Sequence, residues 1–132
     1  MAARASTTSL SNPASSSFGA VEVTPYPVVH GASGGPFLAY RIEADGRTIA
    51  YSADTEWTDA LIPAARNADL FICEAYYYDR VVKNHLDLKT LEQHLSEIAP
   101  KKLVLTHMSD DMLGRLDQLP HMAASDGLVI EF

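Results

Sequence analysis

The sequence predicts a layered α/β fold. Short β-branched or apolar runs alternate with stretches of helical periodicity, which is the pattern of layered α/β domains. An Asp-Gly pair at residues 45–46 separates two strand-like runs, as in a tight hairpin. Residues 69–75 (DLFICEA) form a nearly continuous apolar run, typical of a strand covered on both faces.

Size and composition limit the function classes. The chain has 132 residues, at most one domain, and 47% of them are hydrophobic, as in a globular protein. The formal net charge of −7 argues against charge-driven binding to nucleic acid or to an anionic membrane surface. Cys73 is the only cysteine, which excludes an internal disulfide and favours a reducing, cytoplasmic location. No apolar run reaches the roughly 18 residues of a membrane-spanning helix, so we expect no membrane association.

Residues 1–19 are expected to form a flexible tail. They are rich in Ser, Ala and Thr, with Arg4 as the only charged side chain, and they bury too little apolar surface to offset the entropy lost on ordering. An organelle transit peptide is an alternative, because the stretch is Ser-rich and has no acidic residue. The folded domain is then expected over residues 20–132.

The first half of this domain is predicted to be β-structure. Residues 21–29 (VEVTPYPVV) are β-branched but carry two prolines, so we expect an edge strand or an extended segment. A loop of small residues follows His30. Residues 37–44 and 47–53 then form the two strands of the Asp-Gly hairpin.

Helices and strands alternate in the second half. A short helix is expected over residues 58–66, capped by Thr58 or Asp59, with Pro63 inside it. After the strand at 69–75, residues 86–99 have leucine and isoleucine at helical spacing and predict an amphipathic helix. The remaining expected elements are a strand over 101–107, a helix over 109–116 capped by Ser109, and a terminal strand over 127–132.

Polar residues lie where the predicted strands end. His30, Asp54, Glu74 and His107 are each at or near the C-terminal end of a strand. In layered α/β folds, side chains leave the core at such ends and converge on ligands. Two histidines and an aspartate are donors that suit zinc or another divalent cation. The sequence therefore points to a metal site at one edge of the sheet.

Five segments over residues 20–115 stand out as a set: HGASGGPFLAYRI, IAYSADT, DLFICEA, the Asn84-His85 pair before a helix, and LVLTHMS. Together, and in this order, they resemble the metallo-β-lactamase superfamily, and within it the ribonuclease Z-like and phosphodiesterase-like branch. Each segment alone is unspecific, but SADT, a strand ending in Glu and LVLTHMS form a fairly specific set. The resemblance implies the C-terminal half of an αββα sandwich, a mixed sheet with helices on one face, as a partial domain over residues 20–132.

The resemblance also implies roles for single residues. His30, Asp54 and His107 are implied as metal ligands in a site for two zinc ions, with Asp54 bridging the ions. His85 is implied as the acid that protonates the leaving group, oriented and kept cationic by Glu74. A hydroxide bridging the two metals would attack a phosphodiester or related ester. The implied substrate is a small-molecule, nucleotide or RNA phosphodiester.

The chain departs from the family in one large respect. The ligand cluster His-x-His-x-Asp-His occurs nowhere in the sequence, and the five histidines are isolated from one another. The remaining ligands supply about two protein donors per zinc, fewer than the three or four that hold the ion tightly. We therefore expect a metal-dependent hydrolase that is inactive as an isolated chain. A second copy or an N-terminal half on another chain would complete it, unless the sequence is a truncated gene product. The alternative is a non-catalytic binding or assembly module derived from the same fold.

Structural alternatives exist for individual residues. Asp54 also has the context of a turn aspartate, and Glu74 has Arg80 as an alternative partner. We expect His94 and His121 at the surface without a role. The aromatic run at residues 76–78 is interpreted as loop packing, with stacking on a substrate base as the alternative. Cys73 is expected to be an inert core residue.

Overall fold

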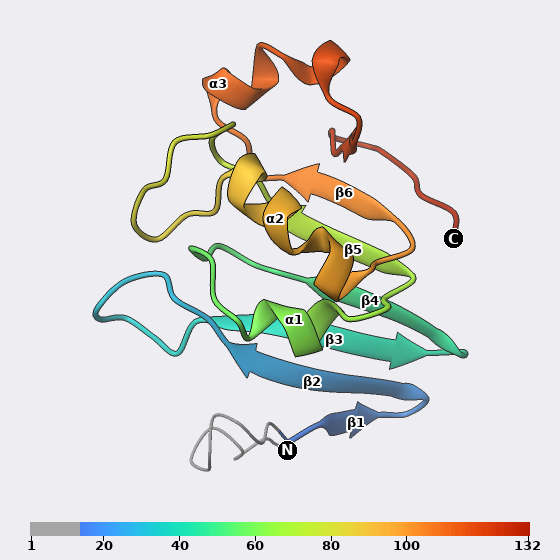
Figure 1. Ribbon diagram of the computed structural model, residues 1–132. Coiled ribbons are helices and arrows are strands. Elements are labelled where there is room, and N and C mark those ends of the chain that lie inside the picture. Colours follow the sequence, from blue (N-terminus) through green and yellow to red (C-terminus); the bar gives the residue numbers. More distant parts are fainter. Residues whose placement is uncertain (1–13) are drawn as a thin grey trace.

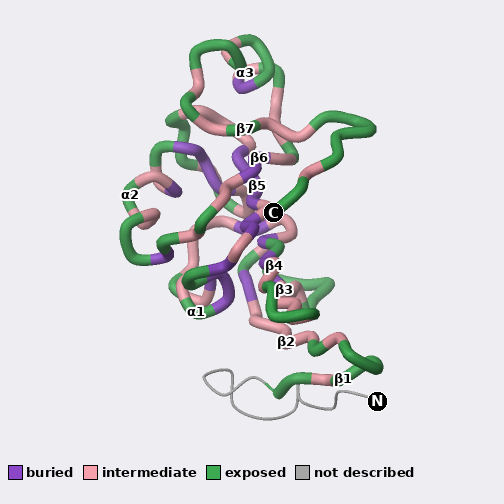
Figure 2. The backbone as a smooth tube through the Cα atoms, turned by 90° about the vertical axis from the view of Figure 1, so that its right-hand side faces the viewer, coloured by how far each residue is buried: buried purple, intermediate pink, exposed green. Residues whose placement is uncertain are grey.

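The computed structural model describes residues 14–132 and contains one seven-stranded mixed sheet, its strands in sequence order (Figure 1). The first four strands pair antiparallel and the last four pair parallel. The two longer helices, α1 and α2, lie on one face of the sheet (Figures 1 and 2). The α/β fold with a mixed sheet and helices on one face is confirmed. The strands are β1 (Ser16–Phe18), β2 (Val21–Pro27), β3 (Leu38–Ala44), β4 (Arg47–Tyr51), β5 (Leu70–Glu74), β6 (Leu103–Thr106) and β7 (Met122–Ala123), and the helices are α1 (Leu61–Ala65), α2 (Leu88–Ile98), α3 (Asp110–Leu113) and the 3-10 turn η2 (Leu116–Gln118).

Part of the segment predicted to be a flexible tail is a β-strand. Within the segment predicted to be flexible, Ser16–Phe18 forms β1 and pairs antiparallel with Val21–Val23 of β2. The composition of residues 1–19 hid this strand, because three residues are too few to give a pattern. Residues 1–13, on which the tail and transit-peptide predictions also fall, lie outside the described residues.

The expected strand at residues 21–29 is β2, and its edge character is half correct. β2 pairs with β3 along its whole length but with β1 only over Val21–Val23. Pro25 and Pro27 lie beyond β1, where one side of β2 has no strand partner among residues 14–132. A proline is tolerated there because no ladder hydrogen bond needs its missing N–H.

The hairpin between β3 and β4 follows the prediction. Asp45 and Gly46 have φ of 50° and 72°, so both turn residues are left-handed, as a two-residue type I′ turn requires. The register Ala44↔Arg47 closes the hairpin directly around them.

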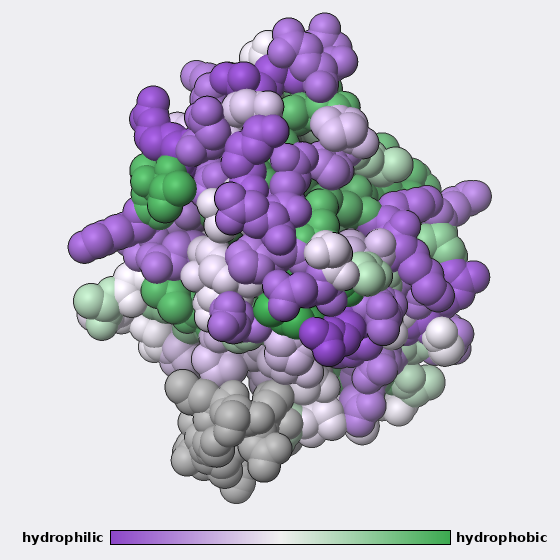
Figure 3. Space-filling view, viewed as in Figure 1, coloured by the Kyte–Doolittle hydropathy of each residue, from purple (hydrophilic) through white to green (hydrophobic). Residues whose placement is uncertain are grey.

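Helix α2 also follows its sequence pattern. Asp87 caps it by accepting hydrogen bonds from the Thr90 N–H at 2.9 Å and the Thr90 hydroxyl at 2.7 Å. Leu88, Leu91 and Ile98 are fully buried against the sheet. The outer side of the helix is polar, and the helix-bearing face of the molecule is largely hydrophilic (Figure 3).

Of the capping predictions for the shorter helices, the one for α1 is wrong and the one for α3 is correct in position only. The N-cap of α1 is Ala60, with no side-chain capping bond, because Asp59 accepts from the Trp57 ring N–H instead. Pro63 sits in the first turn of α1, where its missing N–H would have no helical partner anyway. Ser109 is the N-cap of α3, but its hydroxyl donates to the Tyr76 carbonyl rather than to the helix.

The predicted terminal strand over residues 127–132 is wrong. That segment has no strand, and Val129 is 82% exposed. Met122–Ala123 takes the edge of β6 instead, in the register Val104↔Met122 and Leu105↔Ala123. The last residues turn back past the sheet, where Lys102 Nζ donates to the Glu131 carbonyl at 2.9 Å.

The core lies between the sheet and helices α1 and α2. It contains Phe71, Cys73 and Leu105 from the sheet and Leu61 and Leu91 from the helices, all without exposed surface. Burial raises the pKa of the Cys73 thiol, consistent with an inert core cysteine. No helix in the described part of the chain is long and apolar enough to cross a membrane.

Candidate metal and catalytic site

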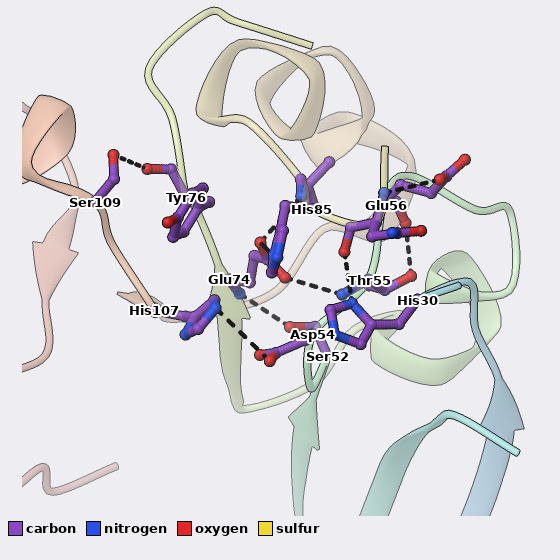
Figure 4. A network of polar contacts seen from close by, with 12 residues as sticks. His30, Ser52, Asp54, Thr55, Glu56, Glu74, Tyr76, His85, His107 and Ser109 are labelled. Atoms are coloured by element: carbon purple, nitrogen blue, oxygen red, sulfur yellow. Dashed lines mark hydrogen bonds and ion pairs between the residues drawn. The ribbon is translucent and has the colours of Figure 1, made fainter. Parts of the chain in front are cut away.

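The predicted site residues meet at one edge of the sheet. β2, β4, β5 and β6 run in the same direction, so their C-terminal ends share that edge. His30 and Asp54 each follow their strand by three residues, Glu74 ends β5, and His107 directly follows β6. His85 reaches the same place from the loop before α2 (Figure 4).

The imidazole rings form a compact group. The ring centroids of His30 and His85 are 5.0 Å apart, and those of His85 and His107 are 5.2 Å apart. Tyr76 packs on the group, with its ring centroid 4.6 Å from that of His85 and 5.3 Å from that of His107. The fold thus brings together three imidazoles, of which the outermost two, His30 and His107, are 77 residues apart in sequence.

Glu74 is a buried carboxylate aimed at His85. Its Oε2 lies 2.7 Å from His85 Nδ1, and its side chain has no exposed surface. The backbone N–H of Thr55 donates to Oε1 at 2.9 Å, and that of Leu86 donates to Oε2 at 3.1 Å. Arg80, the alternative partner, instead lies over the Tyr77 ring.

The environment shifts the pKa of both members of this pair. Burial raises the pKa of Glu74 to about 7, against the two backbone N–H donors, which lower it. Burial, followed by the nearby His30, lowers the pKa of His85. Both shifts disfavour the charged forms, so His85 favours its neutral imidazole over the cation more strongly than a free histidine does. The cationic form implied by the resemblance would need an added negative charge nearby.

His30 has a fixed tautomer. Its Nδ1 lies 2.8 Å from the carbonyl oxygen of Asn84. A carbonyl can only accept, so Nδ1 carries the hydrogen and donates. The other ring nitrogen, Nε2, is then left with its lone pair, which is the state of a metal-ligating histidine oriented by an outer partner.

His107 and Asp54 are the most exposed members of the group. His107 Nε2 lies 3.6 Å from Asp54 Oδ2, and the two side chains are 41% and 39% exposed. Two donors of a tetrahedral zinc ion, each about 2.0–2.2 Å from it, are separated by about 3.4 Å. The pair therefore fits a shared zinc-type cation, and His30 Nε2 adds a donor of the right chemistry.

Glu74, His85 and His107 also place potential ligand atoms within 4.8 Å of one another. Glu74 nevertheless suits orientation better than ligation, because both of its oxygens already accept hydrogen bonds from buried groups. Binding a cation would leave the N–H of Thr55 or Leu86 without an acceptor.

The backbone is strained next to the site. Three residues other than glycine with positive φ adjoin or belong to it, namely Ala53 at 54°, Asn84 at 72° and His107 at 52°. Such conformations cost on the order of 1–3 kcal/mol each and persist where surrounding contacts impose them. They lie directly before Asp54, directly before His85 and at His107 itself.

Several residues of the site were not foreseen from the sequence. Ser52 Oγ accepts from the Glu74 N–H, and Glu56 Oε1 accepts from the Asn84 N–H at 3.0 Å. Thr55 Oγ1 accepts from the Val29 N–H at 3.1 Å. Ser52 and Thr55 stand in the SADT segment, but the sequence predicted no contact for them. The partners in these hydrogen bonds are 22–28 residues apart in the chain, which leaves no local signal.

The other histidines lie outside this group. His121 Nε2 is 2.8 Å from Glu92 Oε2. His94 is less exposed than expected, because its ring stacks on Trp57 with centroids 3.6 Å apart. Of the tyrosine run, only Tyr76 packs on the site histidines, and Tyr78 lies under the cations of Lys89 and Arg115.

Comparison with known proteins defines the class. Residues 2–108 match the family described as beta-lactamase superfamily domain, so the match begins before residue 20. The chain is 30% identical over 93 residues to the probable metallo-hydrolase YhfI of Bacillus subtilis, covering 68% of the chain and 34% of that protein. The chain therefore belongs to the metallo-β-lactamase superfamily.

Individual relatives refine this placement. A 69-residue stretch is 36% identical to ribonuclease Z of Methanosarcina acetivorans, covering 48% of the chain and 23% of that protein. The crystal structure of a diphosphatase from the PhnP family superposes with a TM-score of 0.72 at 25% identity, over 89% of this chain and 46% of that one. The chain spans about a third or less of the length of these curated relatives.

Proposed function

We propose that this protein acts in metal-dependent hydrolysis of phosphodiesters or related esters. The supporting observation is the pairing of His85 with the buried Glu74 at 2.7 Å, next to the separate donor set of His30, Asp54 and His107. Glu74 thus orients His85 for proton transfer, while the second set of residues offers metal ligands. The diphosphatase and ribonuclease Z among its relatives act on phosphate-containing substrates, as their names state.

His30, Asp54 and His107 would hold the metal, with zinc as the expected ion. When bound, a zinc-type cation supplies Lewis-acid polarisation of the substrate and lowers the pKa of bound water. His85 would exchange a proton with the leaving oxygen through Nε2, while Glu74 fixes the proton on Nδ1. The anionic substrate would itself favour the protonated form of His85, which the free protein disfavours.

The ligand set would be completed by residues outside this sequence. The sequence contains no His-x-His-x-Asp-His, and the cluster offers three donors besides His85. We propose that another copy of the chain or a polypeptide segment carrying that motif adds the rest. A nucleotide or RNA phosphodiester is the proposed substrate, and the cytoplasm is the proposed location.

Zinc stoichiometry after exhaustive dialysis tests the proposal first. We expect the wild-type chain and the control His121→Ala to retain zinc and His107→Ala to lose it. Hydrolysis of bis(4-nitrophenyl) phosphate should follow zinc content and fall at least about 100-fold in His85→Ala, since general acid catalysis contributes that much or more. A wild-type chain without zinc or hydrolysis would show that copies of this chain alone do not complete the site, and the chain would then be either a fragment of the hydrolase or the non-catalytic module.

A further inference from the structure

We infer that Glu56 is a positioning residue that fixes His30 and His85 together, acting through the backbone of one residue, Asn84. The carboxylate of Glu56 touches neither histidine. The expected effect of Glu56 on metal binding rests on the proposed function, whereas its expected effect on the histidine geometry does not.

The inference stands on a closed ring of hydrogen bonds. Glu56 Oε1 accepts from the Asn84 N–H at 3.0 Å, and the Asn84 carbonyl accepts from His30 Nδ1 at 2.8 Å. The ring closes through the chain, because the Glu56 N–H donates to the carbonyl of Val29 at 2.9 Å. Figure 4 shows Glu56, Thr55 and His30 side by side at this point.

Glu56 contributes two hydrogen bonds of different kinds to this ring. The bond to the Val29 carbonyl joins two backbone groups and would survive a change of the Glu56 side chain. The bond from the Asn84 N–H depends on the carboxylate, which is the only acceptor among the described contacts of that N–H. A side-chain substitution therefore removes the bond to Asn84 and leaves the bond to Val29 in place.

Asn84 is the residue that loss of this hydrogen bond would affect most. Its φ of 72° is a left-handed conformation that needs support from surrounding contacts. Its carbonyl is the acceptor for His30, and the next residue is His85, whose Nδ1 has to meet Glu74. Rotation at Asn84 would thus release the tautomer of His30 and the position of His85 in one movement.

The chemical consequence concerns the ligand atom of His30. While Nδ1–H donates to the Asn84 carbonyl, Nε2 keeps its lone pair. Without that acceptor, the hydrogen is free to occupy Nε2, and the ring is no longer poised to bind a cation. Loss of outer partners of ligating histidines typically lowers metal affinity about 10- to 100-fold.

The experiment compares Glu56→Ala with Glu56→Gln, because the glutamine keeps a side-chain oxygen for the Asn84 N–H and removes only the charge. Glu97→Ala is the matched control, a glutamate on α2 whose side chain is 55% exposed. The first readout is the tautomer of His30 from long-range ¹H–¹⁵N correlation spectra of the full, metal-free chain. The second is zinc affinity by competition with a chelator.

We expect wild type, Glu56→Gln and Glu97→Ala to show the Nδ1–H tautomer of His30, and Glu56→Ala to show mixed tautomers and about 10- to 100-fold weaker zinc binding. Glu56→Met, equal in length without an acceptor, replaces the alanine variant if thermal unfolding shows that the latter does not fold. An unchanged tautomer in Glu56→Ala or Glu56→Met would overturn the inference, as would a glutamine variant as impaired as the alanine variant. If wild type binds no zinc, copies of this chain alone do not form the proposed metal site, but the tautomer still decides the role of Glu56.

Discussion

At the scale of single residues, Glu74 makes contacts that affect both the site and the stability of the fold. It receives two backbone N–H groups and one imidazole N–H while fully buried. Its residue type and its place at the end of β5 were predictable, because a charged residue closing an apolar strand stands out. The resemblance implied its pairing with His85, but the backbone N–H groups of Thr55 and Leu86 that donate to it were not predictable, because they come from two other segments of the chain.

We predict that Glu74→Ala lowers the free energy of unfolding by at least about 2 kcal/mol. The alanine leaves the buried N–H groups of Thr55 and Leu86 without acceptors, at about 1–3 kcal/mol each. Urea denaturation measures the change, with Glu97→Ala expected within about 0.5 kcal/mol of wild type. A Glu74→Ala variant as stable as that control would show that Glu74 has no part in holding the fold.

At the scale of elements, Asp69 ties the starts of two parallel strands together. Its Oδ2 accepts from the Thr48 N–H in β4 at 2.8 Å, and its Oδ1 lies 3.2 Å from Lys101 Nζ, just before β6. The Thr48 N–H and then Lys101 lower the pKa of Asp69 below its usual range. The side chain thus supports the parallel half of the sheet at the end opposite the site.

This pKa shift predicts a pH dependence of stability. A carboxyl group with a lowered pKa in the folded state stabilises the fold above its unfolded pKa of about 3.9 and loses that contribution as pH falls through the folded pKa. Asp69→Asn keeps an acceptor for Thr48 but cannot ionise. We therefore expect wild type to exceed Asp69→Asn in stability at pH 6 and the two to converge near pH 2, as measured by urea denaturation. A difference of equal size at both pH values would contradict this explanation.

At the scale of the whole molecule, the site joins segments that only the completed sheet brings together. The ends of β2, β4, β5 and β6 contribute one residue each, and the loop before α2 contributes His85. A cation bound there would bind the folded chain and not the unfolded one. Binding to the native state alone raises stability with ligand concentration.

We predict that zinc at 100 times its dissociation constant stabilises the chain by about 2.7 kcal/mol. The thermal unfolding midpoint should rise with zinc, fall with a chelator, and show no zinc response in His107→Ala. His121→Ala should respond as wild type does, since His121 pairs with Glu92 outside the site. A zinc response that persists in His107→Ala would place the bound ion elsewhere.

The sequence by itself determined several local elements and the residues that meet at the candidate site. Asp45-Gly46 specified a hairpin because both residues tolerate positive φ, and the leucine spacing specified α2 because its buried face repeats with the helical period. His30, Asp54, Glu74 and His107 were identified by their place at strand ends, which is also a local property.

Only the tertiary structure decided which segment pairs with the edge of β6 and which hydrogen bonds connect the residues of the site. Residues 127–132 have strand propensity, yet Met122–Ala123 occupies the edge, because edge pairing depends on which segment reaches β6. Likewise, the His30–Asn84 contact spans 54 residues and the Asn84–Glu56 contact spans 28. Contacts of that range leave no periodicity or motif in the chain, since they exist only after the sheet has formed and its strand ends meet.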